Sequence, residues 1–281
     1  MTEHAVWLGL TQAELDRQYD QRALVPDMTD YMARWAAAGE ALRRRSPPAV
    51  LRYGPHPDER LHLHPGAPGG PVHMHLHGGA WRALGADDAD FVAPALGAEG
   101  ATVVVPNFSL APAEPLPAIV AQIRRCFLWL RATVPGAERL FVSGHSSGAH
   151  LAACLLDAEW RREAGLPSDA PAGLTLVSGA YDLEPVRLSA RNDYLRLSAA
   201  EADALSPIRR LPADPPPAAV FWGDGEHEEF KRQSRELAAA LGAAAVVAAA
   251  LPANHFEMYD AFADPASPVV RAALAQMRAI G

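Results

Sequence analysis

Short apolar runs alternate with amphipathic segments along most of this chain. Runs that read as strands cover residues 50–53, 61–64, 72–76, 102–106, 140–143, 174–178, 218–222 and 245–249. Apolar residues recur at helical spacing in residues 118–131, 147–159, 228–241 and 268–280. Because strands buried on both faces read as continuous apolar runs, this alternation predicts an α/β fold. We expect a mostly parallel, eight-stranded sheet with helices on both faces.

The first part of the chain has a different pattern of predicted elements. Residues 11–45 have helical spacing with a break at Pro26-Asp27, and three strand-like runs follow them. The turn-forming stretch from Pro65 to Gly70 separates the second and third of these runs, so we predict that those two pair as an antiparallel hairpin. We expect a single domain over residues 1–281, in which the helices of 11–45 and the polar segment 184–212 form a small cap.

Composition and charge narrow the possible partners. The chain has 25 Lys and Arg against 33 Asp and Glu, a net charge of −8, and no basic run longer than Arg43-Arg44-Arg45. Nucleic acids and anionic membranes are therefore unfavourable partners. Cys126 and Cys154 cannot build a disulfide framework and lie in apolar helical stretches, so we expect two buried apolar side chains.

No segment reads as a targeting or membrane-spanning element. Residues 1–10 lack the basic and apolar regions of a signal peptide. Residues 237–253 are apolar, but Gly242 and Pro252 within them indicate a helix end, a glycine stop and a short buried strand. We therefore expect a soluble, cytoplasmic protein that binds no membrane. The oligomeric state stays open, a homodimer included.

A motif that suits a nucleophilic serine follows one of the predicted strands. Gly144-His145-Ser146-Ser147-Gly148 comes directly after residues 140–143 and opens a helix. The glycines of G-x-S-x-G permit a sharp turn that lifts the serine hydroxyl above the sheet edge, and a helix N-terminus favours negative charge beside it. The motif alone is often an ordinary turn. Its place between strand and helix makes Ser146 the candidate nucleophile.

A loop with two adjacent glycines follows the strand 72–76. It reads His77-Gly78-Gly79-Ala80-Trp81. Acyl transfer needs main-chain N–H groups directed at an oxyanion, and glycines let the main chain approach without Cβ obstruction. Gly78 and Gly79, with the amide of Ser147, are therefore the predicted oxyanion hole. The alternative is a simple glycine turn, which the order of the two motifs disfavours.

The base and the acid are expected after later strands. His255 lies between the last strand and the last helix, where the base lies when the order is Ser, acid, His. The acid should follow residues 218–222, where Asp224 and Glu226 compete. Glu226 leaves the loop room to turn back towards His255 and is favoured. Asp224 and, after the preceding strand, Asp182 are the alternatives.

Other histidines raise a second chemistry. His73, His75 and His77 alternate along one strand face, which suggests a metal site. No carboxylate or thiolate partner accompanies them, so we expect neither metal nor cofactor. His145 and His150 flank Ser146, and we expect them to be structural or to line the pocket.

Segments spread over most of the chain match one known family. They are residues 15–20 with Arg22 and Val25-Pro26, and residues 77–81, 110–112, 144–151, 178–183, 206–207, 230–234 and 254–256. By these segments the chain resembles the kynurenine formamidase (arylformamidase) branch of the α/β-hydrolases, close to the hormone-sensitive-lipase-like esterases. The N-terminal segment and the Phe-x-Arg-Gln-Ser segment are more specific than the triad, which many hydrolases share.

The resemblance implies a triad, a substrate and a pathway. The triad would be Ser146, Glu226 and His255, because the family's acid lies four residues before the matching phenylalanine. N-formylkynurenine would be the substrate, in tryptophan catabolism. The chain departs from the family at Ala80, where an aromatic residue is common, and at Ser147, where alanine is common. At Glu226 the family often has aspartate.

Together, the residues and the resemblance predict hydrolysis of an acyl group from an aryl amine or aryl alcohol through an acyl-enzyme on Ser146. The expected partner is a small acyl substrate. Trp81, Tyr181 and Phe256 are candidates to line its pocket, with core packing as the alternative for each. A general carboxylesterase for short-chain esters is the first alternative function. A hydrolase fold without activity that binds a ligand is the second.

Overall fold

Eight strands form one sheet in the computed structural model, which describes residues 4–279. Their order across the sheet is β1-β2-β4-β3-β5-β6-β7-β8. β2 runs antiparallel to β1 and β4, and the other neighbouring pairs are parallel. The predicted mostly parallel sheet is confirmed. The strands are β1 (Ala49–Arg52), β2 (Arg60–His64), β3 (Val72–Leu76), β4 (Thr102–Pro106), β5 (Leu140–His145), β6 (Gly173–Val177), β7 (Ala218–Gly223) and β8 (Ala245–Leu251).

The predicted pairing of the second and third strands is wrong. β4 lies between β2 and β3, and the antiparallel hairpin is β1 with β2. The stretch from Pro65 to Gly70 passes over the start of β4, where the Ala67 N–H donates to the Gly100 carbonyl at 2.9 Å. Hairpin loops are usually two to five residues long. This longer stretch spans two strand spacings, about 10 Å, and leaves room for β4.

Helices cover both faces of the sheet because successive side chains of each strand point to opposite faces. Met74 and Leu176 pack into the core on one face, and Phe141 and Phe221 into the core on the other. On the first face lie α5 (Leu116–Thr133), α6 (Ser147–Ala153), α7 (Ala158–Glu163) and α11 (Glu228–Leu241). On the second lie α2 (Thr29–Arg45), α3 (Ala86–Ala89), α4 (Ala93–Leu96), α12 (Glu257–Asp260) and α13 (Pro268–Ala279).

The predicted helix over residues 147–159 is two helices. α6 ends at Ala153, and α7 begins after Asp157, whose side chain accepts hydrogen bonds from the N–H groups of Glu159 and Trp160 at 3.0 and 3.1 Å. An aspartate in this capping position starts a new helix. Cys154 lies in the turn between them and, like Cys126, is buried and free, as expected.

One prediction near the C-terminus is wrong, and another falls on residues outside the described part of the chain. β8 is a strand at the sheet edge, and its residues alternate between partly buried and exposed, with Val246 54% exposed. The prediction of a buried strand is wrong because an edge strand has a neighbour on one side alone. The predicted end of the last helix at Ile280, like residues 1–3 of the N-terminus, lies outside the described residues. In the described part of the chain, no helix has the length and apolarity needed to cross a bilayer.

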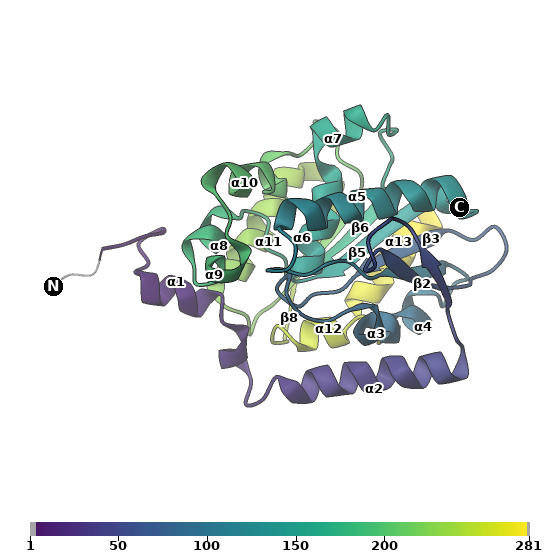
Figure 1. Ribbon diagram of the computed structural model, residues 1–281, viewed down its shortest axis with the longest axis horizontal. Coiled ribbons are helices and arrows are strands. Elements are labelled where there is room, and N and C mark those ends of the chain that lie inside the picture. The colour runs from purple at the N-terminus through teal and green to yellow at the C-terminus, as the bar shows by residue number, and fades with distance from the viewer. Residues whose placement is uncertain (1–3, 280–281) are drawn as a thin grey trace.

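The N-terminal helices contact the segment 184–212 at one end of the sheet. Figure 1 shows α1 (Gln12–Gln18) beside α8 (Glu184–Leu188) and α9 (Asn192–Leu195), with α10 (Ala199–Ala204) next to them. The Gln12 side chain donates to the Leu188 carbonyl at 2.8 Å, and the Tyr194 hydroxyl donates to the Ala80 carbonyl at 3.1 Å. The second contact joins α9 to the loop after β3. The role of these segments as a cap stays a prediction.

Candidate active site

The turn after β5 holds Ser146 in a conformation that few residues other than glycine adopt. Its φ is 54° and its ψ is −121°. A Cβ atom on Gly144 would overlap the Gly148 carbonyl oxygen, and one on Gly148 would overlap the Leu76 carbonyl oxygen in β3. Glycine at both positions therefore allows strand and helix to meet at this sharp turn, as the motif predicts.

Three buried polar side chains form a hydrogen-bonded chain beside this turn. The His255 Nε2 atom lies 3.0 Å from the Ser146 Oγ atom, and His255 Nδ1 hydrogen-bonds to Glu226 Oε1. A carboxylate accepts hydrogen bonds, so Nδ1 carries the proton and Nε2 is free to accept one from the serine. This is the geometry of a nucleophile, a base and an orienting acid.

The carboxylate that meets the imidazole is Glu226, which the sequence favoured. Its Oε2 atom accepts hydrogen bonds from the Gly223 N–H at 2.7 Å and from the Ser178 hydroxyl at 2.9 Å. Asp224 is exposed, and its N–H still pairs with the Leu251 carbonyl at 2.8 Å along the sheet edge. The loop turns back only after Asp224, so this carboxylate does not reach the base.

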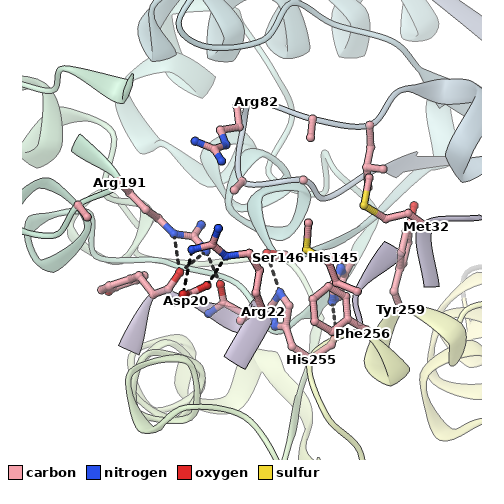
Figure 2. Close-up of a pocket in the computed structure, with 18 of the residues that line it drawn as sticks. Asp20, Arg22, Met32, Arg82, His145, Ser146, Arg191, His255, Phe256 and Tyr259 are labelled. Carbon is pink, nitrogen blue, oxygen red and sulfur yellow. Dashed lines mark hydrogen bonds and ion pairs between the residues drawn. The ribbon is translucent and has the colours of Figure 1, made fainter. Parts of the chain in front are cut away.

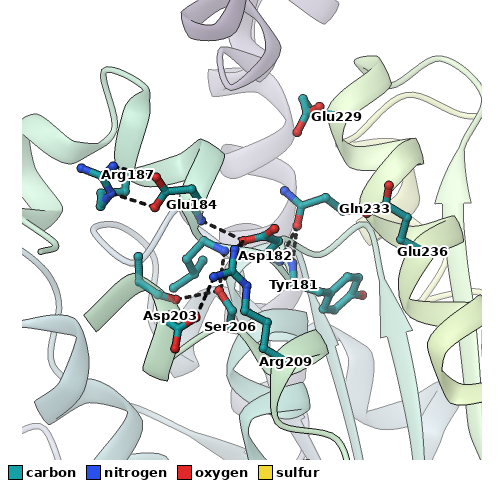
Figure 3. Close-up of polar contacts among 12 residues, drawn as sticks. Tyr181, Asp182, Glu184, Arg187, Asp203, Ser206, Arg209, Glu229, Gln233 and Glu236 are labelled. Carbon is teal, nitrogen blue, oxygen red and sulfur yellow. Dashed lines mark hydrogen bonds and ion pairs between the residues drawn. The ribbon is translucent and has the colours of Figure 1, made fainter. Parts of the chain in front are cut away.

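Asp182, the third candidate acid, belongs to a separate network, which Figure 3 shows. It accepts a hydrogen bond from Arg209 at 2.8 Å, and Arg209 also donates to Asp203 at 2.7 Å. Next to them, the Ser206 hydroxyl accepts from the Leu183 N–H at 2.8 Å. These contacts attach α10 and the turn after it to the end of β6.

The Phe-x-Arg-Gln-Ser segment lies in α11 and supports the base. The Phe230 ring packs edge-on against the His255 imidazole, with 4.9 Å between centroids and 67° between planes. The Gln233 side chain accepts a hydrogen bond from the Asp182 N–H at 2.7 Å and donates to the Tyr19 hydroxyl at 2.8 Å. It thereby joins the end of β6 to the N-terminal segment (Figure 3). Sequence reasoning singled out this segment but not these contacts.

The glycine loop after β3 lies against Ser146. A Cβ atom on Gly78 would stand 3.4 Å from the Ser146 Cβ, and Gly79 has a φ of +104°. Across residues 4–279, neither glycine N–H donates to a main-chain acceptor. Ser147 opens α6, and the first N–H groups of a helix have no partner within it. Gly78 and Ser147 therefore lie next to Ser146, and the oxyanion hole made by the three amides stays a prediction.

Two of the three predicted pocket aromatics lie in the core instead. Tyr181 is fully buried and Trp81 is 1% exposed, and neither lines the cavity at Ser146. The Trp81 indole donates to His150 Nδ1 at 3.1 Å, and His150 Nε2 donates to the Leu205 carbonyl at 2.9 Å. This hydrogen bond anchors the glycine loop to α6, and Trp81 has a positive φ of 60°. Phe256 does line the cavity.

A cavity of about 720 Å³ opens above Ser146. Figure 2 shows Ser146 and His255 between two unlike walls. One wall is apolar and aromatic, and consists of Met28, Met32, Trp35, Leu84, Phe256 and Tyr259. The other is charged, and consists of Asp16, Arg17, Asp20, Arg22, Arg82, Arg191 and Asp193. Sequence reasoning missed the charged wall. Four of its members lie in the N-terminal segment that carries the family resemblance, but no local signal placed that segment, or Arg82, Arg191 and Asp193, at the cavity.

His145 lines the cavity and contacts the base from behind. Its Nε2 atom donates to the His255 main-chain carbonyl at 2.9 Å, and its ring stacks on Tyr259 with 4.8 Å between centroids. Burial first, and the His255 imidazole second, lower the pKa of His145 well below its usual range. His145 is therefore a neutral structural partner of the loop that carries His255.

The alternating histidines of β3 are packed in the core. His73 and His75 both hydrogen-bond to the Ser143 hydroxyl, at 2.7 and 2.8 Å. The His77 ring stacks on Phe108 with 4.2 Å between centroids. Burial lowers the pKa of His73 to about 3 and that of His77 to about 4. Within the described chain, the hydrogen-bond partners of these three histidines include no carboxylate or thiolate. Those are the further ligand types that the hypothesis of a metal site would require.

His62, Asp87 and Asp90 lie close enough together to hold a cation. However, Arg43 donates to Asp90 at 2.7 Å, and His62 Nδ1 lies 2.8 Å from the same carboxylate oxygen. Although burial acts to raise it, hydrogen bonds from His62, His64 and Arg43 lower the pKa of Asp90 to about 2. Arg43 of α2 and His62 of β2 both hydrogen-bond to Asp90, so the cluster is a satisfied ion pair rather than an open cation site.

Known proteins resemble this chain over most of its length. Residues 73–254 match the family of proteins with the α/β-hydrolase fold. The chain is 31% identical over 253 residues to the kynurenine formamidase of Danio rerio, which covers 85% of this chain and 86% of that protein. A candidate thioesterase from Silicibacter sp. TM1040 superimposes with a TM-score of 0.83 at 28% identity, over 93% of this chain and 99% of its own. A hormone-sensitive lipase from a metagenome library shares the fold, with a TM-score of 0.65 at 23% identity over 87% of this chain and 90% of its own. The protein is therefore a hydrolase that belongs to the α/β-hydrolase fold family, in the branch of the kynurenine formamidases.

Proposed function

We propose that this hydrolase cleaves an aryl formamide such as N-formylkynurenine, or a related aryl ester, through an acyl-enzyme on Ser146. The observation that carries the proposal is the hydrogen-bonded chain from Ser146 through His255 to Glu226 beside the Gly78 and Gly79 amides. The similarity to a kynurenine formamidase supports the substrate.

Acylation follows from the positions of these groups. His255 Nε2 takes the hydroxyl proton of Ser146 as Oγ attacks the formyl carbon. The carbonyl oxygen becomes an anion beside the amides of Gly78, Gly79 and Ser147, and one well-placed donor is worth about 3 kcal/mol. Glu226 holds the Nδ1 proton and stabilises the imidazolium. The imidazolium then gives its Nε2 proton to the arylamine nitrogen as the carbon–nitrogen bond breaks.

Deacylation uses the same groups with water in place of the amine. Ser146 now carries a formyl ester, and His255 takes a proton from a water molecule as its oxygen attacks the ester carbon. The imidazolium returns that proton to the serine oxygen, and formate leaves. An aryl ester would pass through the same steps with a phenol as the leaving group.

The cavity suits a small aromatic substrate. Its volume of about 720 Å³ lies in the range of small-molecule sites, and Met32 and Phe256 offer an apolar wall to a ring. Ala80, at a position where the family commonly has an aromatic residue, leaves space beside the glycine loop. We further propose that residues 11–45 and 184–212 cap this cavity and that the protein acts in the cytoplasm.

The test compares substrates on the purified full chain. We expect turnover of N-formylkynurenine, measured beside p-nitrophenyl acetate and an aryl thioester. Ser146→Ala should lower kcat by about 10⁴-fold or more, because removal of a triad nucleophile leaves only the binding and oxyanion contributions. Ser46→Ala, at an exposed serine outside the cavity, is the matched control.

Each outcome decides one part of the proposal. If esters or the thioester turn over while the formamide stays intact, the formamidase assignment fails and the carboxylesterase or thioesterase reading replaces it. If a fluorophosphonate probe does not label the wild-type protein and no substrate turns over, the chain is a binding protein rather than an enzyme.

A further inference from the structure

The charged wall of the cavity holds an arginine that the proposed reaction does not use. Arg82 follows the glycine loop, and its guanidinium lies over the Tyr194 ring, 4.6 Å from the centroid. Tyr194 is itself held by its hydrogen bond to the Ala80 carbonyl. Within residues 4–279, Arg82 has neither a hydrogen bond nor an ion pair through its side chain, and Figure 2 shows it directed at the cavity. All of its donors are therefore available to a ligand.

A second arginine of this wall has no acidic partner. Arg191 donates through Nε and Nη2 to the Tyr19 carbonyl, at 3.1 and 2.9 Å, and through Nη2 to the Gln21 side chain. In the described part of the chain, its Nη1 atom donates to no group. Burial lowers the pKa of Arg191, and the nearby charge of Arg82 acts in the same direction. Arg82 and Arg191 thus lie near each other, and within residues 4–279 neither side chain forms an ion pair, although the charge of Asp20 acts on Arg191 in the opposite direction to Arg82.

The acids of the same wall do not neutralise this pair. Asp20 is in an ion pair with Arg22 at 2.6 Å, and Asp16 accepts a hydrogen bond from the Ala190 N–H at 2.7 Å. Asp193 is exposed. Arg82 is exposed, whereas Arg191 is half-buried, so it is the Arg191 guanidinium that is partly removed from water without an ion-pair partner, which is unfavourable. A bound anion would supply the missing charge.

The position of this pair relative to Ser146 defines which part of a substrate it can reach. In Figure 2 the arginines lie on one side of Ser146 and His255, and Met32, Phe256 and Tyr259 lie on the other. A substrate whose ring packs on the apolar wall, with its acyl carbon at Ser146, can extend a ring substituent towards Arg82 and Arg191.

We propose that Arg82 and Arg191 bind a carboxylate on the leaving-group half of the substrate. Guanidinium groups present donors in a fork that matches a carboxylate, whereas a neutral substituent leaves them unpaired. The protein is therefore selective for acyl arylamines or aryl esters that carry a carboxylate over those that lack one. The inference depends on the proposed function for the place of the acyl group at Ser146.

The sharpest test uses two compounds that differ in the carboxylate alone. N-formylkynurenine carries it, and N-formylkynuramine lacks it but keeps the ring, the formamide and the ammonium group. We expect the wild-type protein to prefer the first by about tenfold in kcat/KM, which is about 1.4 kcal/mol. In Arg82→Gln the KM for N-formylkynurenine should rise and the preference should fall towards unity, whereas the KM for N-formylkynuramine should not rise. Arg44→Gln removes the same charge from an exposed helix position outside the cavity and should keep the preference.

A binding measurement separates this inference from the proposed function. In Ser146→Ala, calorimetry should show tighter binding of kynurenine than of kynuramine, and Arg82→Gln in that background should remove the difference. Arg191→Gln should do the same, but its contact with Tyr19 is structural, so circular dichroism must first show that it folds. Failure to hydrolyse either formamide counts against the proposed function. Equal affinities in Ser146→Ala, no binding of either compound, or an equal loss for both in Arg82→Gln overturns the carboxylate site.

Discussion

Lowering the pH from 7 to 5 should remove several kcal/mol of stability through the buried histidines. Burial lowers the pKa of His73 to about 3 and the pKa values of His77 and His150 to about 4. It also lowers the pKa values of His75 and His145 well below their usual range. These imidazoles stay neutral in the folded protein at pH 5, whereas the unfolded chain can protonate them.

The size of the effect follows from this difference in bound protons. A histidine has a pKa of about 6.5 in the unfolded chain, so at pH 5 its protonation favours unfolding by about 2 kcal/mol. His73, His77 and His150 together should lower the free energy of unfolding by about 6 kcal/mol, which is comparable to the total stability of many domains. Because their pKa values are depressed on folding, this stability is present above about pH 6.5 and is lost as the pH falls below it. Asp90, with a pKa of about 2, contributes at lower pH.

The assay is urea unfolding followed by tryptophan fluorescence at pH 7, 6 and 5. His77→Gln removes one titrating group and one ring stack. It should lower stability at every pH, but its loss between pH 7 and 5 should be about 2 kcal/mol smaller than that of the wild type. His4→Asn, at an exposed position, is the control and should leave the pH dependence unchanged. If all three proteins lose the same free energy over this range, the buried histidines do not cause the acid sensitivity.

Three further tests, with four substitutions, concern the site. Gly79→Ala places a Cβ atom against the Ala83 carbonyl at a φ of +104°. It should lower kcat by about 10²-fold, the typical effect of one lost oxyanion donor, and a ligand-free melting scan separates unfolding from misplacement of the loop. Glu226→Gln should lower kcat by about 10⁴-fold, while Asp224→Asn stays near the wild type; equal losses would mean that the acid is misassigned. Gln233→Ala removes buried hydrogen bonds and should lower the free energy of unfolding by about 2 kcal/mol in urea titrations, and an unchanged midpoint would refute its structural role.

Local sequence was sufficient to predict the structure where a short motif determines its own backbone geometry. The turn at Ser146 follows from Gly144 and Gly148, because no other residue allows the backbone contacts at those positions. The helix over residues 228–241 ends where Gly242 follows, as predicted. Glu226 was favoured over Asp224 because a carboxylate one residue after the strand still follows the sheet, which the Asp224 N–H does.

Predictions failed where distant segments compete for the same space. The turn from Pro65 to Gly70 suggested a hairpin, but the strand order depends on β4, whose apolar run can pair on both sides. Trp81 is the last residue of the glycine loop, yet its ring lies in the core and donates a hydrogen bond to His150. Neither outcome is encoded within the few residues that a motif spans.

The chemistry of this site depends on local motifs on the sheet, whereas its selectivity depends on segments that are distant in sequence. The reacting groups lie on turns that strands β3, β5, β7 and β8 hold in register, so their geometry depends on the sheet. The cavity walls come mostly from segments outside the sheet, namely the N-terminal helices, the glycine loop, α9 and the region of α12, and Tyr194 of α9 hydrogen-bonds to Ala80 of the loop. Substitutions at Arg82 or Met32 can therefore change which acyl compound binds while Ser146, His255 and Glu226 stay in place. In this chain, the charged wall rather than the triad should therefore decide which acyl compound is accepted.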